Sequence, residues 1–415
     1  MARIIAAADF DPAAFIRAGD RVMCGQIASE PLTLTRALAA AADRIGRLEV
    51  FLGMTLSRTF PRDASANLTF RSYGALGRAA ELSRAGRLDI LPLHYGALSA
   101  ACASRAVGAD VVLIQLGGTP DAPSLGLAND YVAQAARHAR TVIAELNPGT
   151  PVTTGAGLPP DVEVAAFVEA ASPPLEVPSG AMDDASESIG RLIAGLVPDG
   201  ATIQIGVGSI PDAVLSALSS HRDLGVHSGV ATDRILDLIE AGVITNARKG
   251  ARRGATVTNT LIGTRRLYDF AHGNPEIMVL PASETHDYRV LSGLERFFSI
   301  NSANEVDLTG RANSEMAAGH RVGGLGGLPD FARGARASEG GASIIALPST
   351  AAGGRVSRIV PRVETTTAGP GDVDFVVTEF GVADLRFATY GERAGRLAAI
   401  AHPDHREGLE RAARG

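Results

Sequence analysis

Short apolar runs alternate along the chain with longer Ala- and Leu-rich stretches of helical periodicity. The helical stretches include Leu32–Ala42, Asp130–Ala139 and Asp184–Leu196. Continuous apolar runs between helices indicate strands that are buried on both faces, as in a parallel sheet. The pattern therefore predicts an α/β fold with largely parallel sheets covered by helices. The clearest predicted strands are Val111–Gln115, Thr141–Glu145, Ala201–Ile205, Ser343–Leu347 and Phe375–Thr378.

One segment interrupts both periodicities and predicts a domain boundary. Residues Ala171–Ala181 are rich in Pro, Ser and Gly, and the acidic residues Asp184 and Glu187 then favour the start of a helix. A chain of 415 residues is also long for a single core. We therefore expect an N-terminal α/β domain over 1–172 and a C-terminal α/β domain over 183–415.

Charge and cysteine usage exclude several classes of partner. The formal net charge is -6, and no block of Lys and Arg would neutralise a nucleic acid backbone. Cys24 and Cys102 have no redox or metal spacing, and the nine histidines form no metal motif. The chain shows neither a signal peptide nor an apolar run of membrane-spanning length. We expect a cytoplasmic protein that binds no nucleic acid, membrane or metal.

A first glycine loop, Gly206–Pro211, follows a predicted strand and precedes a helix. This layout points backbone N–H groups at an anion, and Gly206 and Gly208 leave room for it. A dinucleotide fingerprint would need a third glycine where Pro211 stands, so no nicotinamide cofactor is expected. A plain tight turn is an alternative. We favour a loop that holds the pantetheine or phosphate of a cofactor, with contacts from Gly206, Gly208, Ile210 and Pro211.

A second glycine loop contains four glycines in five positions: Gly323, Gly324, Gly326 and Gly327. Ordering so many glycines is costly in backbone entropy. A flexible linker is one interpretation. Well-patterned segments flank the loop, so we favour a ligand-binding role.

His227 is a candidate base at a predicted strand end, although a lone histidine there is more often structural. Ser228 is its neighbour in the sequence. Neighbours on a strand point to opposite faces, so the two do not form a nucleophile–base pair.

Together these segments resemble the acetyl-CoA hydrolase/CoA-transferase family. The first loop reads GVGSIP against the family's GIGxIP, and further family motifs follow in order over nearly the whole chain. The resemblance implies two open, mainly parallel α/β domains with an active-site cleft between them. It also implies acyl-CoA and a small carboxylate as substrates, CoA as substrate or product, and a homodimer or a hetero-oligomer. The matching segments are Ile300–Gly310, Gly323–Ala335, Ile345–Pro361, Val376–Arg386 and Ile400–Leu409.

The family nucleophile is missing from this chain. Members attack the thioester with a glutamate, and glycine-loop N–H groups stabilise the oxyanion. The position that the resemblance assigns to this glutamate is Gly229. The glutamine of the family's GGQ motif is Leu328, and the segment Leu116–Leu127 is shorter than in the family. The resemblance therefore implies a changed catalytic centre.

Three hypotheses follow. The first, which we favour, is hydrolysis of an acyl-CoA by water in the space left at Gly229, with His227, Glu305 or Glu315 as the base. The second is transfer of CoA to a carboxylate with a recruited nucleophile such as Glu284 or Glu305. The third is a catalytically silent CoA-binding subunit.

Overall fold

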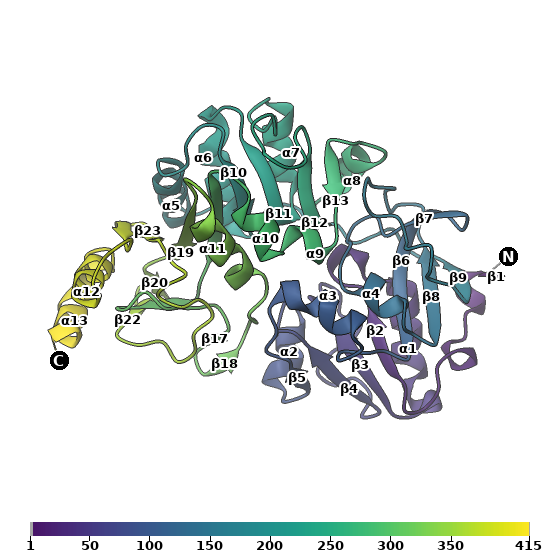
Figure 1. The fold of residues 1–415 in the computed structure, drawn as a ribbon. Helices are drawn as coiled ribbons and strands as arrows, with labels where there is room; N and C mark the ends of the chain where they lie inside the picture. The colour runs from purple at the N-terminus through teal and green to yellow at the C-terminus, as the bar shows by residue number, and fades with distance from the viewer. Residues whose placement is uncertain (1–2, 415) are drawn as a thin grey trace. The chain divides into compact units, whose positions relative to one another are not determined.

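The computed structural model describes residues 3–414 (Figure 1). The chain forms two compact units. The first unit runs to Val177 and also contains Thr258–Glu284 and His320–Gly326. The second unit comprises Pro178–Val257, Thr285–Gly319 and the chain from Gly327 onward. The domain division expected from the sequence, 1–172 and 183–415, assigned neither of the two inserted segments to the first unit and stays a prediction.

The first unit is built on a nine-stranded sheet in the order β1-β9-β8-β6-β2-β3-β4-β5, with β7 paired to β6. All pairings along this order are parallel, and only β7 is antiparallel. The strands are β1 (Arg3–Ile5), β2 (Arg21–Cys24), β3 (Leu48–Leu52), β4 (Leu68–Ser72), β5 (Leu88–Ile90), β6 (Val111–Thr119), β7 (Ala122–Ser124), β8 (Thr141–Leu146) and β9 (Ala166–Glu169). The helices are α1 (Leu32–Ile45), α2 (Ala79–Arg84), α3 (Tyr95–Ala103), α4 (Val132–Ala136), α8 (Arg265–Ala271) and α9 (Ala282–Thr285).

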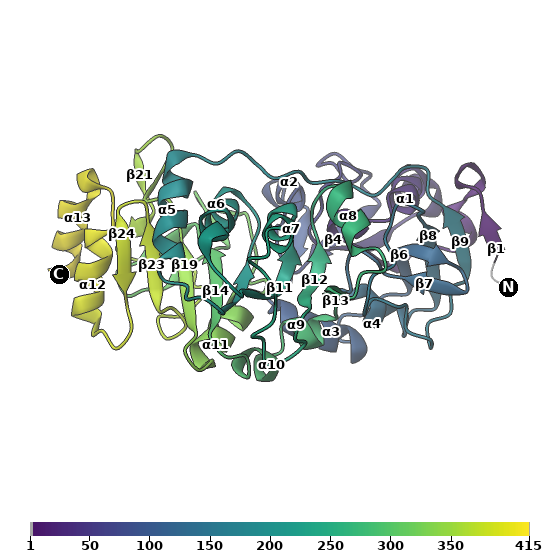
Figure 2. The same ribbon diagram turned by 90° about the horizontal axis from the view of Figure 1, so that it is seen from above.

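The second unit has its main strands in the order β11-β10-β14-β19-β23-β24. The pairs from β11 to β23 are parallel, and β24 is antiparallel to β23. In Figure 2 the helices α5, α6 and α7 lie on one face of this sheet, and α10 and α11 lie on the other. The strands are β10 (Thr202–Ile205), β11 (Gly225–Ala231), β14 (Phe297–Ser302), β19 (Ala342–Ala346), β23 (Phe375–Thr378) and β24 (Gly381–Asp384). Most of β12 (Thr256–Leu261) and all of β13 (Ile277–Val279) belong to the first unit. The helices are α5 (Asp184–Ala194), α6 (Ser209–Ala217), α7 (Asp233–Glu240), α10 (Tyr288–Ser292), α11 (Leu328–Ala337), α12 (Tyr390–Ala399) and α13 (Pro403–Arg414).

A small sheet in the second unit has the order β16-β15-β22. Its strands are β15 (Glu305–Asp307), β16 (Ala312–Asn313) and β22 (Ile359–Val360). Val306, Ile359 and Leu385 are fully buried in the core beneath it. The remaining short strands are β17 (Met316–Ala317), β18 (His320–Arg321), β20 (Thr350–Ala351) and β21 (Val356–Ser357).

The mainly parallel α/β architecture predicted from the periodicity is confirmed. Each of the five predicted strands coincides with a strand of the structure to within a few residues. The helix expected over Asp130–Ala139 is shorter, because the Asp130 carboxylate accepts a hydrogen bond from the Val132 N–H at 2.9 Å and the helix α4 begins only there. The helix α5 begins as expected, with Asp183 as its cap: its carboxylate accepts from the Ser186 N–H at 2.8 Å.

Candidate active site

Strand β11 carries both His227 and Gly229. The Ser228 hydroxyl donates a hydrogen bond to the Ile205 carbonyl on β10 at 3.0 Å, so this serine serves the sheet. His227 and Gly229 are two residues apart and therefore face the same side of the strand. His227 is only 2% exposed, and its ring packs edge-on against Phe297 at 6.4 Å.

The imidazole of His286 lies directly beside Gly229. A Cβ atom added to Gly229 would lie 3.1 Å from Nε2 of His286 and 3.4 Å from Cε2 of Phe331. A Cβ atom added to Gly327 would lie 2.7 Å from the same Nε2. Two glycines thus allow the main chain to approach one buried histidine. We call the residues Gly229, His286, Gly327 and Phe331 the imidazole cluster.

Burial and neighbouring rings fix the state of this histidine. Burial, together with the nearby His227, lowers the pKa of His286 to about 3. The imidazole is therefore neutral at physiological pH. Its Nδ1 is 2.8 Å from the Thr285 hydroxyl, and its ring packs 4.5 Å from that of Phe331. If Nδ1 carries the proton, the lone pair of Nε2 faces the two glycines.

The local packing explains why His286 is held there. Phe331 is on the first turn of α11, which begins after Gly327 and has a proline within that turn. Phe331 and Phe297 are both buried in a small apolar core with Leu291. This core sits behind the imidazole cluster and excludes water from one side of it. Sequence reasoning missed His286, because nothing in the linear pattern indicates that it meets Gly229.

The first glycine loop leaves open space beside two of its glycines. Strand β10 ends at Ile205, as predicted, whereas helix α6 begins at Ser209, within the segment Gly206–Pro211 that was expected to be a loop. Gly208 has φ +123°, and a Cβ there would meet no atom within 4 Å. A Cβ on Gly206 would meet only Pro211, at 4.0 Å. Ile210 and Pro211 are buried in the first turn of α6. The main chain at Gly206 and Gly208 is thus accessible, and the CoA-binding role of these residues stays a prediction.

The second glycine loop has structural reasons for its glycines within the first unit. A Cβ on Gly324 would lie 2.5 Å from the Tyr73 carbonyl oxygen, and Gly326 has φ +55°. The Gly323 carbonyl accepts from the Ala75 N–H at 2.9 Å. Close packing and backbone conformation therefore require glycine here independently of any ligand.

The predicted carboxylates lie elsewhere in the second unit. Glu305 is on β15 in the small sheet, where its carboxylate accepts from the Asn313 amide at 3.0 Å. Glu315 is buried and accepts from the Thr367 hydroxyl at 3.1 Å. Both carboxylates thus serve the small sheet and its loops, whereas Gly229 lies on the main sheet. Their catalytic roles stay predictions.

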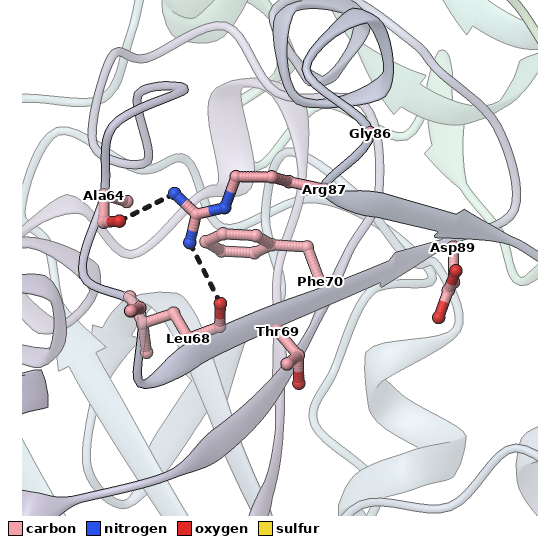
Figure 3. A pocket seen from close by; sticks show the side chains of 8 residues that line it. Ala64, Leu68, Thr69, Phe70, Gly86, Arg87 and Asp89 are labelled. Carbon is pink, nitrogen blue, oxygen red and sulfur yellow. Dashed lines mark hydrogen bonds between the residues drawn. The ribbon is translucent and has the colours of Figure 1, made fainter.

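The first unit contains a pocket of about 410 Å³ beside β4 and β5 (Figure 3). Its Arg87 guanidinium donates to the carbonyls of Ala64 and Leu68 at 2.6 and 3.1 Å, and it lies over the Phe70 ring. Main-chain oxygens thus occupy this cation, and no predicted site residue lines the pocket.

Over residues 3–414, the structure shows no group of three or more His, Cys, Asp or Glu residues that could hold a metal ion. In the same range, no helix combines the length and apolar character needed to cross a membrane.

Comparison with known proteins identifies the family. Residues 263–413 match the model of the acetyl-CoA hydrolase/transferase C-terminal domain. The 4-hydroxybutyrate coenzyme A transferase of Clostridium kluyveri is 37% identical over 94% of this chain and 92% of its own length. The crystal structure of RipA from Yersinia pestis is 34% identical with a TM-score of 0.91, covering 99% of this chain and 97% of that one. A 4-hydroxybutyrate CoA-transferase structure from Porphyromonas gingivalis is also 34% identical, with a TM-score of 0.83 over 99% and 97% of the two chains. The chain belongs to the acetyl-CoA hydrolase/CoA-transferase family.

Proposed function

We propose that this protein hydrolyses an acyl-CoA thioester by direct attack of water. One observation carries the proposal: Gly229 offers no nucleophile, and a neutral imidazole nitrogen lies 3.1 Å from where its Cβ would be. The family supplies the substrate class, acyl-CoA, with CoA as a product. His286 then replaces His227 and Glu305 as the favoured base.

The chemistry requires few groups. The water oxygen attacks the thioester carbonyl carbon while Nε2 of His286 accepts one water proton. Backbone N–H groups at Gly206, Gly208 and Gly327 are the candidates to bind the oxyanion. The carbon–sulfur bond then breaks, and the CoA thiolate takes up a proton. The products are a carboxylate and free CoA, and no metal or nicotinamide takes part.

The low pKa of His286 makes it a weak base, so the proposal depends on the positioning of water and on oxyanion stabilisation. The similarity to a 4-hydroxybutyrate CoA transferase favours a second candidate, transfer of CoA to a small carboxylate. A silent CoA-binding subunit is the third.

The test is incubation of the pure protein with a panel of acyl-CoAs, with and without acetate, while free CoA and acyl exchange are followed separately. We expect CoA release without acetate, and a loss of roughly 10²-fold or more in His286→Ala. Acyl exchange that depends on acetate would contradict the hydrolase proposal and support CoA transfer. Binding of acyl-CoA without either reaction would contradict both enzyme hypotheses and support the catalytically silent CoA-binding subunit.

A further inference from the structure

The first unit contains a buried polar cluster that the proposed reaction does not use. Its members are between 1% and 8% exposed, and we call them the tyrosine cluster: Gln26, Tyr73, Tyr95, Asp130 and Tyr131. The Tyr73 ring lies 5.4 Å from that of Tyr95 and 6.2 Å from that of Tyr131. Burying so many polar groups away from water is stable only when they form hydrogen bonds with one another or with the main chain.

Three hydrogen bonds of this cluster form one chain through Tyr73, Gln26 and Tyr95. The Tyr73 hydroxyl donates to Oε1 of Gln26 at 2.8 Å, and Nε2 of Gln26 donates to the Tyr95 hydroxyl at 3.0 Å. The Tyr95 hydroxyl then donates to Oδ1 of Asn259 at 2.9 Å. Tyr73 and Tyr95 are thereby fixed in orientation as well as in position.

The same two tyrosines hold the second glycine loop through their backbones. The Tyr95 N–H donates to the Gly326 carbonyl at 2.9 Å. Gly324 packs so closely on Tyr73 and Gly74 that its Cβ would lie 2.5 Å from the Tyr73 carbonyl oxygen. The segment Gly323–Gly326 therefore rests on residues whose side chains belong to the tyrosine cluster.

Asp130 is the member with an incomplete set of partners. Its Oδ1 accepts from the Val132 N–H at 2.9 Å, whereas Oδ2 is buried without a hydrogen-bond partner in the described chain. Burial raises the pKa of Asp130 to about 7, although the Val132 N–H and the Gln26 side chain act in the opposite direction. The titratable groups that face this carboxyl are Tyr73, Tyr95, Tyr131 and Cys102, and none of these is a cation.

Ionisation of Asp130 creates a competition for donors. A buried carboxylate requires hydrogen-bond donors. Among the neighbouring donors, the hydroxyls of Tyr73 and Tyr95 and one N–H of the Gln26 amide are used in the chain that ends at Asn259, so the stronger pull of a carboxylate on Gln26 acts on both tyrosines. A carboxylate that captures one of them breaks this chain and releases a tyrosine.

We propose that Asp130 is a positioning residue for the segment Gly323–Gly326. With its carboxyl protonated, the tyrosine cluster holds this segment in one conformation. When Asp130 loses its proton, its carboxylate attracts the donors of the hydrogen-bond chain. The bonds that hold Tyr73 and Tyr95 then weaken, and the segment Gly323–Gly326 becomes more mobile. The consequence for acyl-CoA binding rests on the proposed function, whereas the movement of the segment does not.

The test is hydrogen exchange at the backbone amides of 322–327 in the full chain, at about pH 6 and about pH 8, corrected for intrinsic exchange rates. In the native protein we expect protection to fall roughly tenfold over this range, and in Asp130→Asn we expect no change. The matched control is Glu145→Gln, because burial also raises the pKa of Glu145 to about 7, yet its carboxylate accepts from the Thr33 N–H at the start of α1.

The control should keep the native pH dependence at these amides. Tyr95→Phe, which deletes one link of the hydrogen-bond chain, should lower protection at both pH values and serves if Asp130→Asn does not fold. Persistence of the pH dependence in Asp130→Asn, or its absence from the native protein, overturns the proposal. A rise in KM for acyl-CoA with pH that Asp130→Asn abolishes, with kcat little changed, would extend it to the reaction. An inactive protein would refute the hydrolase and leave the exchange result intact.

Discussion

At the residue scale, two glycines decide what the centre of the second unit can do. Gly229 and Gly327 both face Nε2 of His286, at separations too short for a relaxed side chain on either. The absence of a side chain at position 229 therefore goes together with the close approach of this imidazole. A carboxylate at position 229 and this imidazole compete for one volume.

Gly229→Glu alone should therefore fail to restore a transferase. The new Cβ would press on His286 and Phe331, and overpacking of this kind costs about 1–3 kcal/mol. Gly229→Glu combined with His286→Ala should relieve the contact and yield acetate-dependent CoA exchange with loss of hydrolysis. Urea unfolding and the exchange assay measure the two effects, with His286→Ala alone as control. Efficient transfer by the single variant would contradict this coupling.

Gly327→Ala tests whether the space around Nε2 of His286 is also crowded on the side of Gly327. Its Cβ would lie 2.7 Å from Nε2 of His286, although its φ of −91° suits any residue. We expect a loss of about 1–3 kcal/mol in the free energy of unfolding, together with lower turnover. Gly371→Ala is the control, because a Cβ there meets nothing within 4 Å. Equal effects of the two substitutions would argue against a crowded imidazole cluster.

At the element scale, the buried side chain of Lys249 holds the start of strand β11 in place. Lys249 is 1% exposed, and its ammonium donates to the carbonyls of Val226 and Ala255 at 2.7 Å each. Its stem packs against Gly225, whose Cβ would lie 2.5 Å from Cγ of the lysine. The start of the strand that carries His227 and Gly229 is thus held by the side chain of one buried lysine.

Lys249→Met should keep the packing of the stem and remove both hydrogen bonds. Two carbonyls without donors cost about 1–3 kcal/mol each, partly offset by the removal of a buried charge. We expect lower protection of the β11 amides against hydrogen exchange. Arg36→Met, which changes an exposed cation in the first unit, should leave these amides unaffected. Unchanged protection in Lys249→Met would show that β11 does not depend on the ammonium.

Most elements could be predicted from the sequence, because strand and helix periodicities are local. The order of the sheets and the position of His286 could not, since both depend on contacts between residues far apart in the chain. The second glycine loop shows the same limit. Its composition suggested a ligand, whereas Gly324 is required in part by the Tyr73 backbone. Only the resemblance to the family motifs drew attention to Gly229, as the expected position of the glutamate, and the structure shows that His286 lies beside it.

At the scale of the whole molecule, buried ionisable groups give the two units opposite responses to pH. In the first unit, burial raises the pKa of Asp130 and of Glu145 to about 7. In the second unit, burial lowers the pKa of Lys249 to about 7. At a given pH, each folded unit therefore binds a different number of protons from its unfolded chain. This difference makes the free energy of unfolding depend on pH.

The direction of each pH response follows from whether the folded or the unfolded chain binds more protons. Between about pH 4 and pH 7 the folded first unit binds more protons than its unfolded chain, so these carboxyls contribute stability at low pH that is lost as the pH rises to about 7. Between about pH 7 and pH 10 the unfolded second unit keeps the Lys249 proton that the folded unit releases, so its stability rises with pH. Native-state hydrogen exchange, which resolves the units, should show the first less stable at about pH 7 than at pH 5 and the second more stable at about pH 9 than at pH 7. Asp130→Asn with Glu145→Gln should flatten the first response, and Lys249→Met should flatten the second. If both units follow the same pH profile, or if these substitutions leave the profiles unchanged, other groups govern the stability of the molecule.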